Sequence, residues 1–280
     1  MINWSESDRV VYRAAATPLL ISVVTVVFND LDGIRRTCAS LQHLAVSAEW
    51  IVIDGGSTDG TAEWLRMEKY PWLRYVSEGD KGIYDAMNKG WQMARGEWVY
   101  FLNSGDTLRS GLTCVLAVDP GVDVVSGRVE LEDSGGHSLG RMHPPSGAVR
   151  DDLLSSNCVA HQATLLRRHL IDRYGAYSLA FRIQGDFEYW ARLMRAGARF
   201  HFIDDVLAGF AYNGVSSQRK NFLRAEYERI AVLRHHGYLG PWQAAWRGLR
   251  TALLYHIKSV LLAVMPTMLV RRLRRIKTDP

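Results

Sequence analysis

The chain has 280 residues, of which 48% are hydrophobic and 22% charged, and its formal net charge is +5. These values are typical of an ordinary folded protein, and the length suffices for one large domain with an accessory segment. Three widely spaced cysteines, Cys38, Cys114 and Cys158, lack a C-x-x-C pair, which argues against a disulfide framework or a cysteine-based zinc site. Residues 1–17 lack the apolar run of a secretory signal, so we expect a cytoplasmic protein with reduced thiols.

The first half of the chain alternates strand patterns with helix patterns. Leu19–Phe28 is rich in valine and isoleucine and predicts a buried strand. Asp32 is predicted to cap a helix in which Ile34, Leu41 and Leu44 share a face. The pattern then predicts the strand Trp50–Ile53, the helix Thr61–Met67, the strand Leu73–Val76, the helix Ile83–Ala94 and the strand Trp98–Leu102. This alternation predicts a parallel sheet with right-handed crossovers.

Polar residues follow three of these strands, at Phe28–Asp30, Asp54–Ser57 and Asn103–Asp106. In parallel sheets a ligand crevice lies beyond the carboxyl ends of the strands, so the three exits are expected to be neighbours. The second exit offers a glycine-rich turn and a carboxylate that a nucleoside could reach. The third offers hard oxygen ligands suited to Mg²⁺ or Mn²⁺. Taken singly, a glycine-rich turn can simply reverse the chain, and an aspartate at a strand end can be a helix cap.

Four ordered motifs change this balance: ISVVTVVFND (Ile21–Asp30), VIDGGSTDGT (Val52–Thr61), EGDKGIYDAMNKG (Glu78–Gly90) and GEWVYFLNSGD (Gly96–Asp106). Together they resemble the family 2 glycosyltransferases. The resemblance implies an α/β, GT-A fold with a Rossmann-like, mostly parallel central sheet flanked by helices. It also implies an inverting sugar transfer in which Asp106 holds a diphosphate-bound Mg²⁺ or Mn²⁺. The nucleotide-sugar donor would be bound by Thr25, Asn29, Asp54, Gly56, Ser57, Asp80, Lys81, Tyr84, Asp85, Asn88, Asn103, Ser104, His161 and Gln162.

Two positions depart from the pattern of many relatives. Gly55 stands where a second acid usually follows Asp54, so the identity of the nucleobase stays open. Asn103 and Gly105 leave Asp106 as the only carboxylate of the metal motif. Asparagine can offer a carbonyl oxygen but no charge. We therefore expect either a weaker metal site or a larger share of the coordination from the donor phosphates.

In the second half, the segment Gln184–Trp190 looks like the acidic motif that carries the catalytic base of the family. By position Asp186 matches the base, while Gly185 replaces the acid that usually precedes it. Asp186 is also suited to be the N-cap of a helix running to Ala196, which is compatible with catalysis. Glu188 lies two residues further, on another helix face, and is expected to be structural.

His161–Ala163 resembles a stretch that lies near the active site in one branch of the family, and Gly214–Ser216 belongs to the downstream pattern of the same branch. His161 is read either as a contact to the donor phosphate or acceptor, or as a satisfied core histidine. The motif of processive members and their spanning helices do not appear. We therefore expect one sugar to be added per encounter.

The C-terminal region has the pattern of a basic amphipathic helix. The apolar run Val260–Val270 is interrupted by Pro266 and is shorter than the roughly 20 residues of a spanning helix. The region is predicted to lie on a membrane surface, or alternatively to pack its stripe on the catalytic core. Nucleic-acid binding is not expected, because no RNA- or DNA-binding signature accompanies the charge. The stripe consists of Trp242, Trp246, Leu249, Leu253, Ile257 and Val260, with Arg247, Arg250 and Lys258 beside it and a cluster from Arg271 to Lys277 after it.

These patterns divide the chain into an N-terminal extension (1–17), a nucleotide-sugar-binding part (18–110), an acceptor-binding and catalytic part of the same domain (111–220) and a basic helical extension (221–280). The expected function is transfer of a single sugar to a glycan or lipid-linked acceptor, in surface polysaccharide or glycolipid biosynthesis. The expected location is the cytoplasmic face of the inner membrane, as a peripheral protein. A non-catalytic nucleotide-sugar or glycan-binding protein is the alternative. A sugar nucleotidyltransferase is a further alternative, but Val26–Asp30 is not a glycine-rich phosphate loop.

Overall fold

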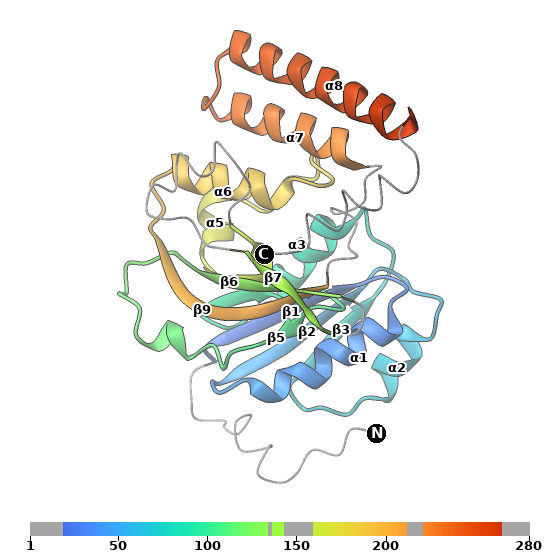
Figure 1. Cartoon of the computed structure of the whole chain (residues 1–280). Coiled ribbons are helices and arrows are strands. Elements are labelled where there is room, and N and C mark those ends of the chain that lie inside the picture. Colours follow the sequence, from blue (N-terminus) through green and yellow to red (C-terminus); the bar gives the residue numbers. More distant parts are fainter. Residues whose placement is uncertain (1–18, 134–135, 143–158, 212–220, 265–280) are drawn as a thin grey trace. The chain divides into compact units, whose positions relative to one another are not determined.

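The computed structural model describes residues 19–133, 136–142, 159–211 and 221–264. The chain divides into two compact units, Met1–Tyr212 and Asn213–Pro280. The order of strands and helices predicted for the first hundred residues is confirmed, with ends that differ by a few residues (Figure 1). These elements are β1 (Ile21–Val27), α1 (Leu31–Ser40), η1 (Leu41–His43), β2 (Ala48–Asp54), α2 (Thr61–Met67), β3 (Leu73–Ser77), α3 (Ile83–Met93) and β4 (Trp98–Phe101).

The rest of the first unit extends the same sheet. It comprises β5 (Thr107–Leu108), η2 (Thr113–Leu116), β6 (Val124–Glu132), β7 (Ser138–Met142), η3 (His161–Ala163), β8 (Thr164–Arg167), α5 (Leu170–Tyr174), α6 (Gly185–Arg195) and β9 (Phe200–Ala211). The strand order is β3-β2-β1-β4-β8-β6-β9-β5, with β7 paired to β6. The four neighbouring strands β3, β2, β1 and β4 run parallel to one another, and β8 pairs with β4 in the antiparallel direction. The predicted α/β fold with helices flanking a central sheet is confirmed.

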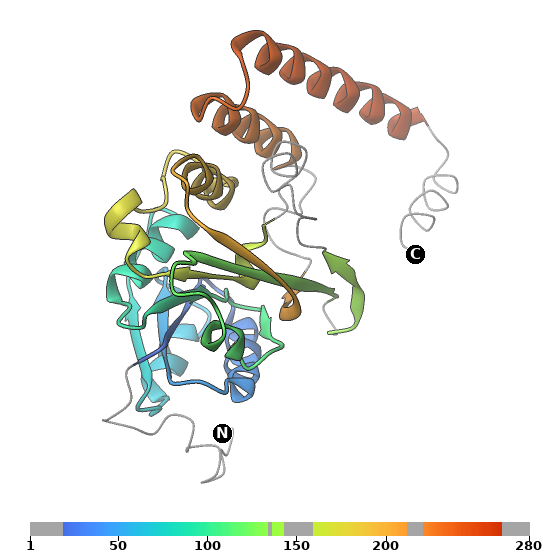
Figure 2. The same cartoon turned by 90° about the vertical axis from the view of Figure 1, so that its left-hand side faces the viewer.

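The two faces of β1 are covered by different helices. Every residue of β1 is buried, and Val23 belongs to the same core cluster as Ile34 and Cys38 of α1. Val24 points to the other face, where α3 approaches so closely that a Cβ atom on Gly90 would lie 2.3 Å from its side chain. Helices α1 and α3 therefore lie on opposite sides of the sheet, as Figure 2 shows from the side.

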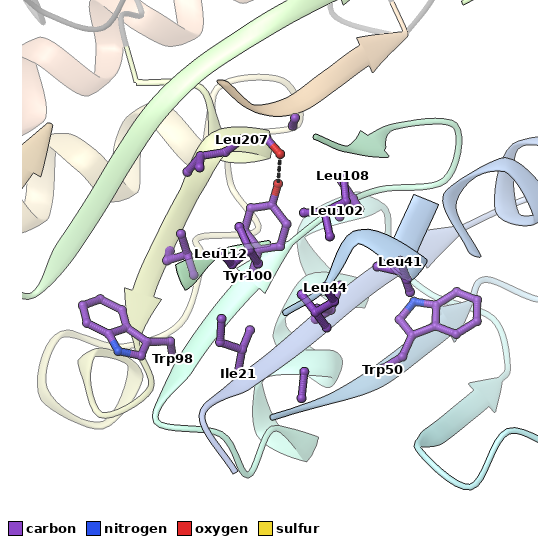
Figure 3. Close-up of a cluster of buried hydrophobic side chains, with 14 of the residues drawn as sticks. Ile21, Leu41, Leu44, Trp50, Trp98, Tyr100, Leu102, Leu108, Leu112 and Leu207 are labelled. Atoms are coloured by element: carbon purple, nitrogen blue, oxygen red, sulfur yellow. Dashed lines mark hydrogen bonds between the residues drawn. The ribbon is translucent and has the colours of Figure 1, made fainter. Parts of the chain in front are cut away.

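Tyr100 lies at the centre of the main hydrophobic cluster. Its ring is surrounded by Leu102, Leu112 and other apolar side chains (Figure 3). Its hydroxyl donates to the carbonyl of Gln162 at 2.6 Å and lies 3.5 Å from the carbonyl of Leu207, so the polar end of the side chain is satisfied inside the core. Full burial of one large apolar side chain contributes about 1.5–3 kcal/mol, and this cluster joins the parallel half of the sheet to the second half.

The capping prediction for α1 was wrong by two residues. Asp30, not Asp32, is the N-cap, and its carboxylate accepts from the backbone N–H of Gly33 at 3.2 Å. Asp30 has the non-helical backbone that an N-cap requires, with φ −145°, whereas Asp32 lies in the first turn with a fully exposed side chain. Leu41 and Leu44 lie beyond the end of α1 but are buried in the same core.

The second unit contains a helical hairpin of α7 (Phe222–His235) and α8 (Pro241–Val264), which lie side by side in both views (Figure 2). The rings of Phe222 and Tyr255 stack with centroids 6.0 Å apart, and Gly248 approaches Tyr227. The face of α8 that packs on α7 thus includes Gly248 and Tyr255. The predicted apolar stripe is a different face and is exposed, with Trp242 at 88%.

Within the described residues, no helix is long and apolar enough to cross a bilayer. Cys38 and Cys114 are free thiols, and burial raises the pKa of Cys38 to about 12, so this thiol is unreactive. The remaining predictions for Cys158, for the extension 1–17, for Pro266 and for the cluster from Arg271 to Lys277 fall outside the described residues.

Candidate active site

The first two strand exits form one continuous loop surface. Strands β1 and β2 pair in parallel so that Val27 lies opposite Asp54, which places the residues after them side by side. The backbone N–H of Asn29 donates to the hydroxyl of Ser57 at 2.7 Å, and the backbone N–H of Thr58 donates to the amide oxygen of Asn29 at 2.8 Å. Asn29 adopts a left-handed backbone with φ 49°, which asparagine tolerates better than most residues. The predicted neighbourhood of these exits is confirmed.

The carboxylate of Asp54 connects the two strand exits through hydrogen bonds. Its carboxylate is fully buried and accepts from the backbone N–H of Ser57 at 3.2 Å. It also accepts from the hydroxyls of Ser57 and Ser77. In this conformation the carboxylate therefore orients the serine loop, and a nucleoside contact by Asp54 stays a prediction. Ser77, at the end of β3, is a partner that the sequence reasoning missed.

The departure at Gly55 has a structural explanation. A Cβ atom at this position would lie 2.6 Å from a carboxylate oxygen of Asp80 and 3.3 Å from the ring of Phe28. The space that a second acid would need is thus occupied by the acid of Asp80, which accepts from the backbone N–H of Gly82 at 2.8 Å. Phe28 is 64% exposed. A carboxylate and an open aromatic ring therefore lie together over a residue without a side chain.

The third exit, Asn103–Asp106, is anchored by α1. The hydroxyl of Thr37 donates to the carbonyl of Asp106 at 2.8 Å and accepts from the backbone N–H of Gly105 at 3.1 Å. The guanidinium of Arg36 donates from Nε to the carbonyl of Gly105 at 2.9 Å. No local pattern indicates a role for Arg36 or Thr37, because their roles depend on the packing of α1 against a loop about 70 residues later. A hydrogen bond of 2.7 Å from the hydroxyl of Ser104 to Asp30 completes the anchoring.

Asp106 is a buried carboxylate with a strongly shifted acidity. Its residue is 3% exposed, and one oxygen accepts from the backbone N–H of Ala211 at 3.2 Å. Burial raises the pKa of Asp106 to about 7, opposed by the nearby charges of His161 and Arg36. A carboxylate held near half-ionisation at neutral pH is ready to bind a cation, which would stabilise its charged form.

This raised pKa predicts how stability depends on pH. Between pH 4 and 7 the unfolded chain has released the proton of Asp106 while the folded chain retains it, so the free energy of unfolding falls as pH rises through this window. Asp106→Asn removes this penalty and keeps an acceptor for the backbone of Ala211. In metal-free buffer its Tm should exceed that of the wild type by a few degrees at pH 8 and by little at pH 4. A Tm difference that does not change with pH would contradict the shift.

The residues around Asp106 fit a divalent cation only in part. The amide oxygen of Asn103 is buried and has no hydrogen-bond partner, so it is free to coordinate. Among the described residues there is no group of three or more histidine, cysteine, aspartate or glutamate side chains that could hold a metal. Asp106 and Asn103 would therefore hold Mg²⁺ or Mn²⁺ with the remaining ligands supplied by phosphate oxygens and water.

Asp186 lies in the first turn of α6, one residue after the helix begins. The N-cap position is Gln184, so the prediction of Asp186 as N-cap was wrong. One carboxylate oxygen accepts from the backbone N–H of Phe187 at 2.7 Å and lies 3.3 Å from the hydroxyl of Tyr84. The other oxygen lies 3.3 Å from Nδ1 of His161. The side chain is 11% exposed, which leaves it within reach of a ligand.

The departure at Gly185 also has a structural explanation. A Cβ atom there would lie 2.6 Å from the ring of Tyr84, so the ring occupies the space of the acid that relatives carry. Burial raises the pKa of Tyr84 well above its usual value, and the proximity of Asp186 adds to this shift. The hydroxyl therefore stays protonated, donates to the carbonyl of Ile183 at 2.9 Å and faces the carboxylate of Asp186.

Glu188 has the structural role expected of it. Its carboxylate is buried and forms an ion pair of 2.6 Å with Arg192, one helical turn later. Arg192 in turn donates to the carbonyl oxygens of Tyr174 and Ala176. Glu188 thus ties α6, through Arg192, to the end of α5 and the segment after it.

His161 joins the third strand exit to Asp186. Its Nε2 atom lies 2.9 Å from the amide nitrogen of Asn103, and its Nδ1 atom lies 3.3 Å from Asp186. The backbone N–H of Asp106 donates to the carbonyl of Asn103 at 3.0 Å. The backbone of Asp106 is therefore linked through Asn103 and His161 to the carboxylate of Asp186, and the roles of the two aspartates stay predictions.

The other predicted donor contacts fall into two groups. Thr25 and Asn88 do not face the site, because the hydroxyl of Thr25 accepts from the indole of Trp50 in the core and the amide of Asn88 pairs with the backbone of Tyr177. A direct donor contact by either side chain is therefore not supported. Gln162 is buried beside His161, and Gly56 adopts φ 82° next to the backbone of Gly79. Lys81 is exposed before α3, and its backbone N–H donates to Asp85 in the first turn of that helix at 3.0 Å. Gly214–Ser216 fall outside the described residues.

Comparison with known proteins identifies the family. The sequence profile of glycosyl transferase family 2 matches residues 22–181. "Uncharacterized glycosyltransferase Rv1514c" of Mycobacterium tuberculosis is 34% identical over 211 residues, covering 71% of this chain and 78% of that protein. "PGL/p-HBAD biosynthesis glycosyltransferase Rv2957" of the same species is 30% identical over 182 residues, covering 60% of this chain and 64% of that protein.

Solved structures show the same fold at low sequence identity. S. aureus TarS 1–349 in complex with UDP has a TM-score of 0.60 at 17% identity, covering 89% of this chain and 76% of that one. Mannosyltransferase PcManGT from Pyrobaculum calidifontis, in complex with GDP-Man and Mn²⁺, has a TM-score of 0.61 at 17% identity, covering 93% and 80%. With a profile match over more than half of its length and these relatives, the chain belongs to glycosyltransferase family 2 and has the GT-A fold.

Proposed function

We propose that this glycosyltransferase inverts the sugar linkage and transfers one sugar from a nucleotide-sugar donor to a hydroxyl of a lipid-linked or glycan acceptor. The observation that supports the proposal is the network Asn103–His161–Asp186, which links the predicted base to a residue of the predicted cation site. Neighbours in complex with UDP, UDP-GlcNAc and GDP-Man support a nucleotide-sugar donor. The glycolipid named for Rv2957 supports a lipid-linked acceptor.

In the proposed mechanism Asp186 accepts the proton of the acceptor hydroxyl. The hydroxyl oxygen forms a bond to the anomeric carbon of the donor while the bond from that carbon to the diphosphate oxygen breaks, and the nucleoside diphosphate leaves with the electron pair. Attack from the face opposite the leaving group inverts the configuration. The backbone N–H of Phe187 and the ring of His161 hold the carboxylate of Asp186 in place. A divalent cation bound at Asp106 and Asn103 would neutralise charge on the leaving diphosphate.

The donor pocket is proposed to lie over the first two strand exits. Asp80 and Phe28 flank Gly55, so a nucleobase could stack on the ring and donate an N–H to the carboxylate. Uracil and guanine carry such a ring N–H, whereas adenine and cytosine do not. This chemistry supports a UDP- or GDP-linked sugar without deciding between them.

A stabilisation panel tests the donor assignment. Purified protein is heated with UDP-glucose, UDP-GlcNAc, GDP-mannose or ADP-glucose in MnCl₂, and a ligand at 100 times its Kd should stabilise the fold by about 2.7 kcal/mol. We expect a UDP- or GDP-linked sugar to raise Tm and ADP-glucose to have no effect. Release of nucleoside diphosphate from the stabilising donor then separates an enzyme from a non-catalytic binding protein. No shift with any of the four donors would contradict the proposal.

The second unit is proposed to hold the enzyme on the cytoplasmic face of the inner membrane. The apolar stripe of α8 is exposed at Trp242, Trp246 and Leu253, and Arg250 accompanies it, which suits a surface of anionic lipid. A peripheral position would keep the site near a lipid-linked acceptor.

Binding to vesicles tests this position. The double variant Trp242→Glu, Trp246→Glu should reduce co-sedimentation with phosphatidylglycerol vesicles at least about tenfold, because it places charge on the apolar face without disturbing buried contacts. Arg199→Gln in the first unit, a substitution at an exposed ion pair, serves as the matched control and should sediment like the wild type. Sedimentation of the double variant at the wild-type level would exclude the stripe as the membrane contact.

A further inference from the structure

We propose that His161 is a positioning residue that donates a hydrogen bond to the base Asp186, and that its ring does not contact the donor. This inference rests on the proposed catalytic role of Asp186. The motif alone left open whether His161 meets the donor, meets the acceptor or is a core residue. The arrangement of its two ring nitrogens decides among these.

Rigid contacts hold the segment that carries His161. The short helix η3 starts at His161, and the carbonyl of Gln162 accepts from the hydroxyl of Tyr100 at 2.6 Å. The hydroxyl of Thr164 donates to the carbonyl of Ala160 at 2.7 Å, which fixes the turn on its other side. The imidazole is 13% exposed, so its position is set by protein atoms and not by solvent.

Asn103 determines which ring nitrogen carries the proton. Its amide nitrogen lies 2.9 Å from Nε2 of His161, and an amide nitrogen can only donate. With the amide in this orientation Nε2 must accept, so the ring proton is on Nδ1. Nδ1 points at Asp186, 3.3 Å away, so this hydrogen bond runs from the histidine to the carboxylate. Both ring nitrogens are engaged by protein groups, and no ring nitrogen remains for a donor phosphate.

The consequence concerns the orientation of the base. One oxygen of Asp186 accepts from the backbone N–H of Phe187 and lies 3.3 Å from the hydroxyl of Tyr84, and the other oxygen is held by His161. Without His161 the second oxygen has no partner among these contacts, and the carboxylate is free to turn away from the acceptor hydroxyl. Misplacement of a catalytic group by about 1 Å can cost on the order of 100-fold in rate.

Two conservative variants separate the ring nitrogens. His161→Asn keeps an N–H donor near the place of Nδ1, whereas His161→Gln places its amide near Nε2. For nucleoside diphosphate release from the donor found by the panel, UDP-GlcNAc or GDP-mannose, His161→Ala should lower kcat about 10- to 100-fold with KM for the donor changed less than about twofold. His161→Asn should recover most of this loss, and His161→Gln should not.

A double-mutant cycle tests whether His161 acts through Asp186. In an Asp186→Asn background, His161→Ala should cause no further loss of kcat, because the group that it positions is already disabled. Full additivity of the two losses would overturn the proposal. So would a normal kcat in His161→Ala combined with weaker binding of UDP or GDP, which would assign the ring to the donor.

The ring proton provides a readout that needs no substrate and no variant. In protein labelled with ¹⁵N-histidine, long-range NMR correlations should show His161 with its proton on Nδ1 and a bare Nε2. A proton on Nε2 alone would overturn the proposal even if His161→Ala fails to fold. The proposed function fails differently: if Asp186→Asn transfers sugar at the wild-type rate, the base is elsewhere, whatever the tautomer of His161.

Discussion

Replacing Asp186 by asparagine is expected to lower kcat for sugar transfer by about 10²- to 10⁴-fold, the usual contribution of a positioned general base. Asparagine has nearly the same volume as aspartate and still offers an oxygen to the backbone of Phe187, but it cannot accept the proton of the acceptor. The side chain of Asp186 is only 11% exposed, so a base from the buffer has little access to take its place. Binding of the nucleoside diphosphate should stay within about twofold of the wild type, since the lost step follows donor binding.

The measurement is steady-state release of nucleoside diphosphate with and without acceptor, beside calorimetry with UDP or GDP. Asp119→Asn is a matched control, because Asp119 is an exposed aspartate in a surface ion pair with Arg199 and its loss should leave kcat unchanged. Near wild-type transfer by Asp186→Asn would exclude this residue as the base. A parallel loss of UDP and GDP binding would instead indicate that the substitution disturbs the fold.

Replacing Asp106 by alanine is expected to remove the dependence of donor binding on metal. Asp106 is the only carboxylate of its motif, and the amide oxygen of Asn103 alone offers no charge to a divalent cation. For the wild type, we expect Mn²⁺ to tighten binding of UDP or GDP at least about tenfold relative to EDTA. In Asp106→Ala the affinity for UDP or GDP should be the same in Mn²⁺ and in EDTA. The neutral amide of Asn103 is then the remaining predicted protein ligand, and it offers no charge to the cation.

Calorimetric titration of UDP or GDP in about 5 mM MnCl₂, about 5 mM MgCl₂ or EDTA provides this comparison. The metal is present in large excess so that even a weak cation site is occupied. Asp32→Ala is the control, because Asp32 is an exposed acid on α1 whose carboxylate is 3.9 Å from Arg35 and has no part in the proposed site. Tight wild-type binding that EDTA does not weaken would contradict a metal role for Asp106. A wild-type affinity that is weak but sensitive to Mn²⁺ would agree with the thinned motif.

Much of the N-terminal half could be predicted because its signals are local. Apolar runs such as Ile21–Val27 and the polar residues directly after them predict strands and their exits, and the parallel order makes those exits neighbours. The motif residues Asp106 and Asp186 were identified by resemblance. Capping was less predictable, because the choice between Asp30 and Asp32 depends on the residue at which α1 begins, and helix ends are uncertain by one or two residues.

The sequence by itself determined the strand and helix order and the family, because these depend on periodicity and on short motifs, and the same motifs predict the roles of Asp106 and Asp186. Only the tertiary structure decided how the departures are compensated: Asp80 fills the space at Gly55, and Tyr84 fills the space at Gly185. The bridge through His161 joins residues 58 and 25 positions away along the chain. Such contacts arise when the sheet and its covering helices pack, and no local pattern encodes which side chains will then meet.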